Sequence, residues 1–306
     1  MTAGLAQTLG LAVLIGVSLG LLGGGGSILA VPLLVYVAGL PAKEAIATSL
    51  LVVGVTSAVG VVPHARAGRV RWRTGLVFGL AGMAGAYPGG RLAGYVPAGL
   101  LLTGFALMML GTAAAMIRGR RVDRPVRHDV PVLRVLVDGV AVGLVTGLVG
   151  AGGGFLVVPT LTLLGGLPMP YAVATSLVVI AMKSFAGLAG YLSTVDIDWR
   201  LAAAVTAAAV AGSLVGGRLA GRIPEKLLRQ GFGWFVATVG VLVLAQQLPV
   251  ELRTNPLLWT GAATAVGGAA AAVALRHYHE RRHRGRRHPG RRHRERRHRE
   301  RQHREH

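Results

Sequence analysis

The segment GGGGSILAVP, residues 23–32, places four consecutive glycines between two apolar stretches of the chain. Each glycine inside a helix costs about 1 kcal/mol relative to alanine, so the run predicts a break in a helix. A second segment with the same pattern, GAGGGFLVVP, occupies residues 150–159. Two such breaks at a fixed spacing indicate that a segment of the chain was duplicated.

The duplication extends well beyond the glycines. A shift of 127 residues aligns the two segments without a gap, and it places the ATSL sequence at 47–50 on 174–177 and Trp72 on Trp199. Between residues 23 and 97, 30 of 75 positions are identical to their counterparts. Because residue types as rare as Trp and Pro stay in register, we interpret the match as an internal repeat, a plan that many secondary transporters use.

The composition is that of a membrane protein. The chain has 306 residues, of which 52% are hydrophobic and only 15% charged, and its mean hydropathy is +0.55. Several runs of about 15 to 20 residues carry little or no charge, which is close to the length of a bilayer-spanning helix. We therefore predict an all-α polytopic membrane protein. The chain contains no cysteine, which excludes disulfides, thiolate metal sites and cysteine nucleophiles.

Equivalent loops of the two copies differ in charge. The loop at 64–73 has a net charge of +4, whereas its counterpart at 191–200 has −1. The loop at 94–100 is uncharged, whereas its counterpart at 221–229 has +2. Cytoplasmic loops carry an excess of Lys and Arg, so equivalent loops are expected on opposite sides of the membrane. The two copies are therefore predicted to be inverted repeats.

Inversion requires each copy to cross the membrane an odd number of times. A hairpin with the glycines at its tip enters and leaves on the same side, so only the three spans that follow it cross the membrane. Each copy is then a Gly-tipped broken-helix hairpin followed by three transmembrane helices. The predicted elements are hairpin arms at 5–22 and 27–38, spans at 45–62, 74–95 and 98–117, a hairpin at 134–166, spans at 171–190, 201–221 and 229–248, and an extra C-terminal span at 257–275. In the alternative, the chain runs straight through the glycines, which gives four parallel spans per copy.

These elements define the domain organisation and the expected location. The predicted parts are a first membrane repeat at 1–117, a basic cytoplasmic linker at 118–133, a second membrane repeat at 134–248, the extra transmembrane helix at 257–275 and an Arg/His-rich disordered tail at 276–306. We expect a multi-pass protein of the cell (inner or plasma) membrane, with its N-terminus outside and its tail in the cytoplasm. The tail could bind anionic lipid headgroups. Nucleic acid is not an expected partner, because no aromatic platform accompanies the charge.

The short second arms of the hairpins suggest a binding site for an anion. An arm of 10 to 12 residues reaches about 15–18 Å, roughly half of the hydrocarbon core, so the tips are expected near mid-membrane. A helix N-terminus presents unpaired N–H groups and a partial positive charge, and glycines let the backbone approach a ligand. The predicted substrate-binding residues of the tips are Gly24, Gly25, Gly26, Ser27, Gly152, Gly153 and Gly154. Tight helix packing is the alternative for these glycines and the preferred interpretation of Gly85, Gly89, Gly212 and Gly216.

Lys183 is the one charged residue within the predicted span at 171–190. A cation buried in a membrane is costly, and Lys183 is expected about 18 Å deep, level with the second tip. Thr56 occupies the equivalent position in the first copy, so one copy alone would supply charge. The predicted site also includes the hydroxyl groups of Thr48, Ser49, Thr175 and Ser176. As alternatives, Lys183 could snorkel to the outer interface, and the hydroxyls could bond to their own helices.

The other assignments are structural. Arg91 and Arg218 recur in the repeat near the ends of spans and are predicted to be interfacial anchors, and Pro32 and Pro159 are assigned structural roles. No catalytic residue, metal site or cofactor is expected. An enzyme is disfavoured because the chain has no HExxH motif, no intramembrane carboxylate pair and no Ser/His/Asp set.

The two segments GGGGSILAVP and GAGGGFLVVP, each followed by a Pro-containing turn and an AxATSL-type helix, resemble the sulfite exporter TauE/SafE family, also called the toluene sulfonate uptake permeases (TSUP). The resemblance covers about residues 5–248. It implies a secondary membrane transporter, a permease or exporter of small sulfur-containing anions such as sulfite or organosulfonates. An anion-selective channel is the alternative function. The resemblance fixes neither the substrate nor the direction of transport.

Overall fold

A computed structural model of the chain describes residues 2–22, 25–118, 132–150, 157–158, 161, 167–219 and 225–247, all of which belong to one compact unit. The predicted span at 257–275 and the tail at 276–306 lie outside the described residues. So do most of the linker and most of the second glycine segment. Throughout the described part every regular element is a helix, in agreement with the predicted all-α class.

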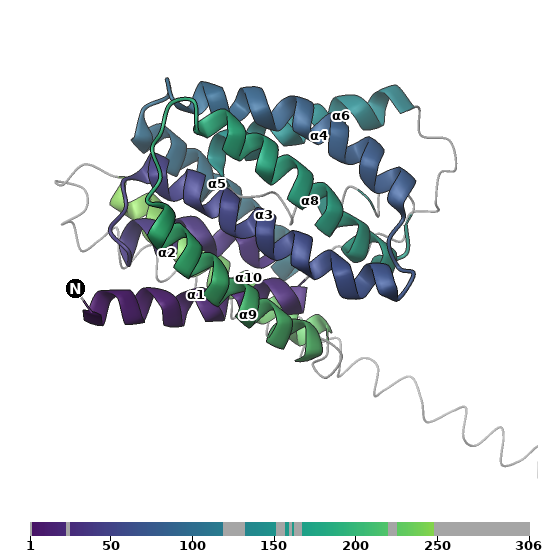
Figure 1. Cartoon of the computed structure of the whole chain (residues 1–306), viewed down its shortest axis with the longest axis horizontal. Coiled ribbons are helices and arrows are strands. Elements are labelled where there is room, and N and C mark those ends of the chain that lie inside the picture. The colour runs from purple at the N-terminus through teal and green to yellow at the C-terminus, as the bar shows by residue number, and fades with distance from the viewer. Residues whose placement is uncertain are drawn as a thin grey trace, which may run out of the picture. The chain divides into compact units, whose positions relative to one another are not determined.

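The helices follow the predicted spans within a few residues (Figure 1). In chain order they are α1 (Thr2–Leu22), the 3-10 helix η1 (Gly25–Leu29), α2 (Ala30–Tyr36), α3 (Ala42–Arg66), α4 (Trp72–Ala93), α5 (Ala98–Arg118), α6 (Val132–Val149), α8 (Met169–Tyr191), α9 (Trp199–Leu219) and α10 (Glu225–Gln246). Two details differ from expectation. The second arm of the first hairpin begins as a 3-10 helix at Gly25, and His64 lies in the last turn of α3 rather than in the loop.

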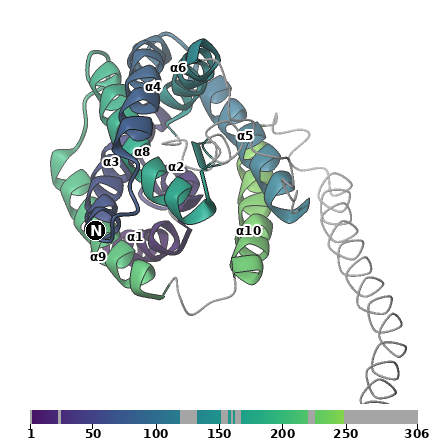
Figure 2. The same cartoon turned by 90° about the vertical axis from the view of Figure 1, so that its right-hand side faces the viewer.

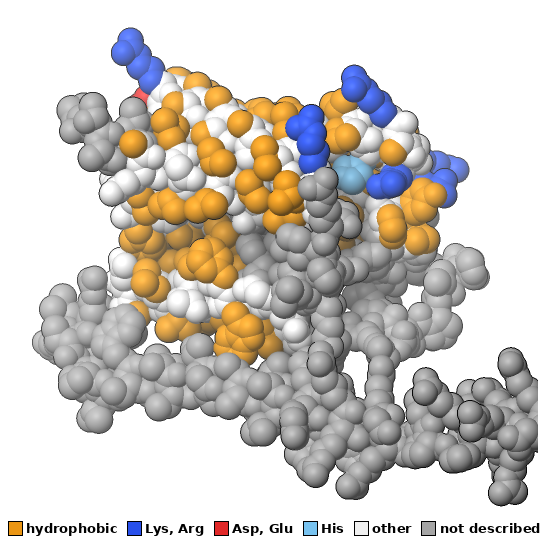
Figure 3. Space-filling model, turned by 90° about the horizontal axis from the view of Figure 1, so that it is seen from below, with side chains coloured by type: hydrophobic (Ala, Val, Ile, Leu, Met, Phe, Trp, Pro, Cys, Tyr) orange, Lys and Arg blue, Asp and Glu red, His pale blue; other side chains and the backbone are white. Residues whose placement is uncertain are grey.

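By length and composition, α3, α8 and α9 are long and apolar enough to cross a membrane. Hydrophobic side chains cover much of the described surface in Figure 3, and most of its Lys and Arg side chains gather in the right half, beside a histidine. Trp72 and Trp199, the first residues of α4 and α9, are 52% and 55% exposed. Exposed tryptophans at helix ends are typical of the membrane–water interface.

The two copies share backbone geometry as well as sequence. Pro41 precedes α3 with φ −54° and ψ 143°, and its counterpart Pro168 precedes α8 with φ −55° and ψ 144°. The Leu40 amide donates to the Leu34 carbonyl over 3.0 Å, and 127 residues later the Leu167 amide donates to the Leu161 carbonyl over 3.2 Å. In both copies, therefore, a proline marks the start of the equivalent helix, because proline cannot continue a helix that precedes it.

Helices of one copy pack against helices of the other through glycines. A Cβ added at Gly216 of α9 would overlap the carbonyl oxygen of Val17 in α1. The equivalent Gly89 of α4 has the same relation to the Leu144 carbonyl in α6. Gly85 and Gly212 likewise lie against backbone of α6 and α1. Tight packing, the preferred interpretation of these four glycines, is confirmed.

At the centre of the unit, α3 packs against α8. A Cβ at Gly60 would lie 3.5 Å from Leu177 Cδ1, and a Cβ at Gly187 would lie 3.4 Å from Leu50 Cδ1. Because rising residue numbers on α3 meet falling numbers on α8, the two helices run in opposite directions along their contact (Figure 1). The two contacts are equivalent under the repeat, and the point midway between them falls beside Thr56 on α3 and Lys183 on α8.

The remaining pair of equivalent helices, α5 and α10, also pack together (Figure 2). A Cβ at Gly240 of α10 would lie 3.1 Å from Met109 Cβ of α5. Met109 and Val236, which are 127 residues apart, are both fully buried in the main hydrophobic core. The helices α3, α4 and α5 of the first copy, and α8, α9 and α10 of the second, therefore each contact the other copy.

Contacts between loops and helix ends define two ends of the unit. At one end, the Lys43 ammonium donates to the Gly94 carbonyl over 2.6 Å, and the Asp198 amide donates to Glu44 Oε1 over 3.1 Å. At the other end, the Arg71 amide donates to Thr175 Oγ1 over 3.0 Å. The start of α3 thus lies with the end of α4 and the loop between α8 and α9, and the first turns of α8 lie with the loop between α3 and α4.

Candidate functional site

Lys183 lies near the middle of α8 with only 2% of its surface exposed. Its Cβ and Cδ pack against Gly82 of α4, where an added Cβ would lie 3.6 and 3.7 Å away. The ammonium nitrogen is buried and makes no hydrogen bond within the described part of the chain. The snorkelling alternative is therefore wrong, because the nitrogen does not reach the surface. An ammonium group buried without a partner costs several kcal/mol, which favours a functional role over a structural one.

The first copy offers no cation at the equivalent place. Thr56 stands there, and its hydroxyl donates to the Val52 carbonyl of its own helix over 2.7 Å. The charge near the crossing of α3 and α8 is thus supplied by the second copy alone, as expected from the sequence.

The predicted hydroxyl groups differ in their hydrogen bonds. Ser49 and Ser176 are buried, and their hydroxyls bond to the carbonyls of Ile46 and Val173 in their own helices at 2.7 and 2.8 Å. Bonding to the parent helix, given above as the alternative for these side chains, is therefore confirmed for both serines. Thr175 Oγ1 accepts the Arg71 amide, whereas Thr48 Oγ1 is buried and makes no hydrogen bond among the described residues.

Ser49 also connects the two copies. Its hydroxyl lies 2.8 Å from the carbonyl oxygen of Gly150, the residue that follows α6. Gly150 has φ +72°, a left-handed conformation that terminates helices and favours glycine, and a Cβ there would collide with Ile46. The first glycine of the second segment therefore ends a helix, a role that differs from the ligand contact inferred for the rest of the segment.

The first glycine segment leads directly to the centre of the unit. Gly25 and Gly26 belong to η1, Ser27 is fully buried, and Ala30 begins α2 in one hydrophobic cluster with Val53 and Ile180. Val53 and Ile180 precede Thr56 and Lys183 by three residues, or about one helical turn. The N-terminal end of α2 thus lies close to the crossing of α3 and α8. Gly24, Gly152, Gly153, Gly154 and Pro159 lie outside the described residues.

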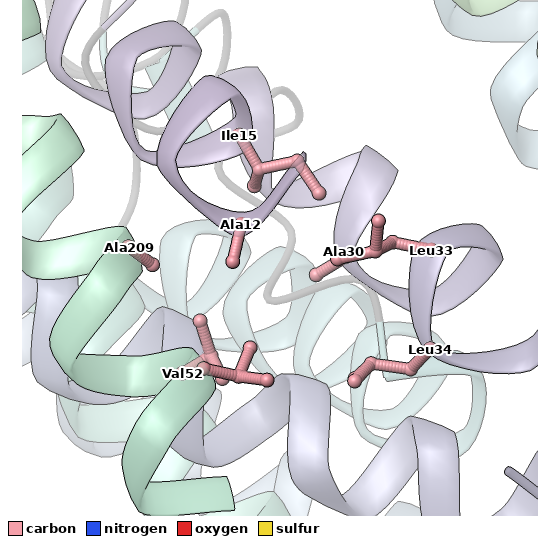
Figure 4. A pocket seen from close by; sticks show the side chains of 8 residues that line it. Ala12, Ile15, Ala30, Leu33, Leu34, Val52 and Ala209 are labelled. Carbon is pink, nitrogen blue, oxygen red and sulfur yellow. The ribbon is translucent and has the colours of Figure 1, made fainter. Parts of the chain in front are cut away.

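A small cavity beside this region is wholly apolar (Figure 4). Its lining consists of Ala12, Ile15, Ala30, Leu33, Leu34, Val52, Val205 and Ala209. An anion has no partner among these aliphatic side chains, so the cavity is not the predicted binding site. The lining also locates α2 relative to α1. Ala12 of α1 and Leu34 of α2 line the same cavity, whereas they would be about 33 Å apart if α1 and α2 formed one continuous helix. The chain therefore turns back between α1 and α2.

Two further buried hydroxyls, those of Ser57 in α3 and Ser184 in α8, are not among the site residues predicted from the sequence. Both are buried, and neither hydroxyl makes a hydrogen bond within the described ranges. A signal was present, because the two serines are counterparts in the repeat and are identical. What could not be seen in the sequence is that their hydroxyls, unlike those of Ser49 and Ser176, do not bond to their own helices.

Three of the four residues predicted to have structural roles lie within the described residues. Arg91 and Arg218 are exposed in the last turns of α4 and α9, and Pro32 is buried within α2. These positions are compatible with interfacial anchors, which remain a prediction. In the described ranges no group of three or more His, Asp or Glu residues could hold a metal ion.

The chain was compared with known families and proteins. A family model described as "Sulfite exporter TauE/SafE" matches residues 8–243. A Xylella fastidiosa (strain Temecula1) protein named "Probable membrane transporter protein" is 34% identical over 247 residues, 78% of this chain and 95% of that protein. The Bacillus subtilis (strain 168) protein named "Probable membrane transporter protein YdhB" is 27% identical over 237 residues, 76% of this chain and 96% of that protein. No solved structure matches this chain at a significant level.

The family match spans nearly all of the described unit, including both glycine segments, α3 with α8, and Lys183. The relatives that match over most of their length are named as membrane transporters, not as enzymes. The chain therefore belongs to the sulfite exporter TauE/SafE family of membrane transporters.

Proposed function

We propose that this protein is a secondary transporter that moves a small sulfur-containing anion, such as sulfite or an organosulfonate, across the cell membrane. The observation that carries the proposal is Lys183, whose ammonium group is buried near mid-helix without a hydrogen-bond partner in the described part of the chain. Such a group attracts an anion strongly, because the surrounding helices provide little screening. The anion would neutralise a charge that is otherwise costly to bury.

The two copies act as inverted repeats, namely the membrane repeats at 1–117 and 134–248. Support comes from α3 and α8, which are counterparts in the repeat and yet run in opposite directions along their contact. The site then lies at the interface between the copies near the midplane, as in many transporters with inverted repeats. Rocking of helices about this point would expose the site to each side of the membrane in turn.

The glycine tips contribute to the same site from two sides. The N-terminal end of α2 lies in one cluster with Val53 and Ile180, next to the crossing of α3 and α8. Backbone N–H groups of Gly24, Gly25 and Gly26, with Gly152, Gly153 and Gly154 as their counterparts, would donate to the anion. Among the predicted hydroxyls, that of Thr48 makes no hydrogen bond within the described residues and that of Thr175 accepts the Arg71 amide, whereas Ser49 and Ser176 bond to their own helices.

The N-terminus lies outside, and the linker at 118–133 and the tail at 276–306 lie in the cytoplasm. Support comes from the charges at the two ends of the unit. Arg66, Arg69, Arg71 and Arg73 lie at the end where α3 finishes, whereas Asp196 and Asp198 lie at the end where α3 begins. An excess of Lys and Arg marks the cytoplasmic side. The basic tail would bind anionic lipid headgroups there.

Single-cysteine labelling tests this orientation, because the chain has no cysteine of its own. We expect a membrane-impermeant maleimide to label Asp196→Cys in intact cells and to label Arg69→Cys only after permeabilisation. Both positions are exposed, so access through the membrane decides the result. Labelling of both from outside would contradict the inverted repeats, and labelling of Arg69→Cys alone would reverse the orientation.

Countertransport in proteoliposomes tests the function and separates a transporter from an anion-selective channel. We expect labelled sulfite or a small sulfonate outside the vesicles to accumulate transiently against unlabelled substrate inside. A channel would dissipate the gradient without such exchange. Absence of both uptake and exchange for sulfite, thiosulfate, taurine, sulfoacetate and aryl sulfonates would refute transport of sulfur-containing anions.

A further inference from the structure

We propose that Ser57 and Ser184 are anion-binding residues that complete, with Lys183, a site for the oxygen atoms of an –SO3 group. This inference rests on the proposed function and extends it to residues that the sequence did not single out. It is carried by the burial of the two hydroxyls, by their lack of hydrogen-bond partners among the described residues and by their position between two helices.

The two serines lie on the facing sides of α3 and α8. Leu50 of α3 contacts Gly187 of α8, and Ser57 follows Leu50 by seven residues, which places both on one face of α3. In the same way, Leu177 contacts Gly60 of α3, and Ser184 follows Leu177 by seven residues. Both side chains therefore point into the contact between the helices. They are counterparts in the repeat, so they stand on either side of the crossing point.

The part of the chain that the structure describes satisfies neither hydroxyl. Ser57 is 1% and Ser184 0% exposed, and neither oxygen makes a hydrogen bond within the described residues. Several other buried serines and threonines of the unit bond to their own helices, as Thr56 does to Val52 and Ser213 does to Val210 over 2.9 Å. A buried hydroxyl without a partner is costly, and two of them at equivalent positions require an explanation.

An oxyanion provides the missing partner. A serine hydroxyl has one proton to donate and an ammonium group has three, and both kinds of donor match acceptor oxygens. Lys183 adjoins Ser184 in the chain and points about 100° away around α8, toward Gly82. The proposal requires its flexible four-carbon stem to turn the ammonium group toward the serines when an anion binds. Two hydroxyls and one ammonium group offer a donor to each of the three oxygens of sulfite or of a sulfonate.

The test measures binding separately from transport, using purified full-length protein in detergent with sulfite and methanesulfonate as probes. We expect Ser57→Ala and Ser184→Ala each to raise the dissociation constant about tenfold or more, as expected for a lost hydrogen bond to a charged ligand. Without ligand, both variants should melt at or above the wild-type temperature, because each removes an unpaired polar group. Ser213→Ala, which removes a buried serine that bonds to its own helix, is the matched control and should bind both anions normally.

The outcomes distinguish this inference from the proposed function. Unchanged affinity in both serine variants would overturn the inference even if the wild type transports sulfite. A lower melting temperature without ligand, combined with normal affinity, would assign the serines to packing instead. If the wild type binds the anions with the predicted losses in the variants but shows no uptake in vesicles, the binding site stands and the transport function fails. Absence of any binding by the wild type would overturn both.

Discussion

Replacement of Lys183 with Met is expected to reduce anion uptake by about ten- to a hundredfold or more while making the protein more stable. The loss of activity follows from the loss of a charge-assisted interaction, for which hydrogen bonds to charged groups contribute about 1.5–3 kcal/mol. The gain in stability follows from the burial of the ammonium nitrogen, which has no hydrogen-bond partner within the described ranges. Met has a similar length and no charge, and replacing buried charge with apolar groups can stabilise a protein by about 1–4 kcal/mol.

Uptake into proteoliposomes and thermal unfolding in detergent measure the two effects on the same preparations. Lys183→Ala should show the same loss of uptake but less stabilisation, because it leaves a void against Gly82. Arg91→Gln is the control, since Arg91 is exposed in the last turn of α4, and its uptake should stay within about twofold of the wild type. Equal losses in the Lys183 and Arg91 variants would remove the central role of Lys183.

Gly216→Ala is expected to destabilise the folded protein, whereas Gly217→Ala is not. The two residues are adjacent in α9 and gain the same helix propensity from alanine, so they form a matched pair. A Cβ at Gly216 would overlap the carbonyl oxygen of Val17, while a Cβ at Gly217 would meet nothing within 4 Å. Because backbone of α1 cannot rotate away as a side chain could, the helices must separate, at a cost of about 1–3 kcal/mol.

Thermal unfolding and the yield of monodisperse protein report this difference. Gly217→Ala should match the wild type or exceed it by up to about 1 kcal/mol. The counterpart Gly89→Ala, which faces the Leu144 carbonyl in α6, should repeat the effect of Gly216→Ala. Equal stability of the two adjacent variants would show that α1 and α9 do not approach as closely as described.

The helices could be predicted from the sequence because their signals are local. Apolar runs set their positions, and Pro41 and Pro168 mark the start of α3 and α8 in both copies. The four-residue spacing of Gly212 and Gly216 predicted close packing, although not that the partner would be α1. The burial of Lys183 was one of two outcomes expected from its place within an otherwise uncharged span, the other being snorkelling to the interface. These features depend on residues within a few turns of one another.

The rest depends on contacts between distant segments. The hydroxyl of Ser57 makes no hydrogen bond among the described residues, and no local pattern separates it from Ser49, which bonds to its own helix. The bond from Ser49 to the Gly150 carbonyl joins residues 101 positions apart, so this link between the two copies was not visible in the glycine run. The family assignment supports membrane transport in general, and the sulfur-containing substrate stays a proposal.

The packing of α1 on α9 and of α4 on α6 joins helices of one copy to helices of the other. A fragment that ends in the linker at 118–133 would leave the glycine surface of α4 without its α6 partner, and the missing neighbours lie in the other half of the chain. We therefore expect the two halves, expressed from separate genes, to be unstable alone and to reassemble when they are made together. Each rigid body that rocks during transport would then contain helices of both copies. The boundary between the moving bodies would therefore differ from the boundary between the two repeats.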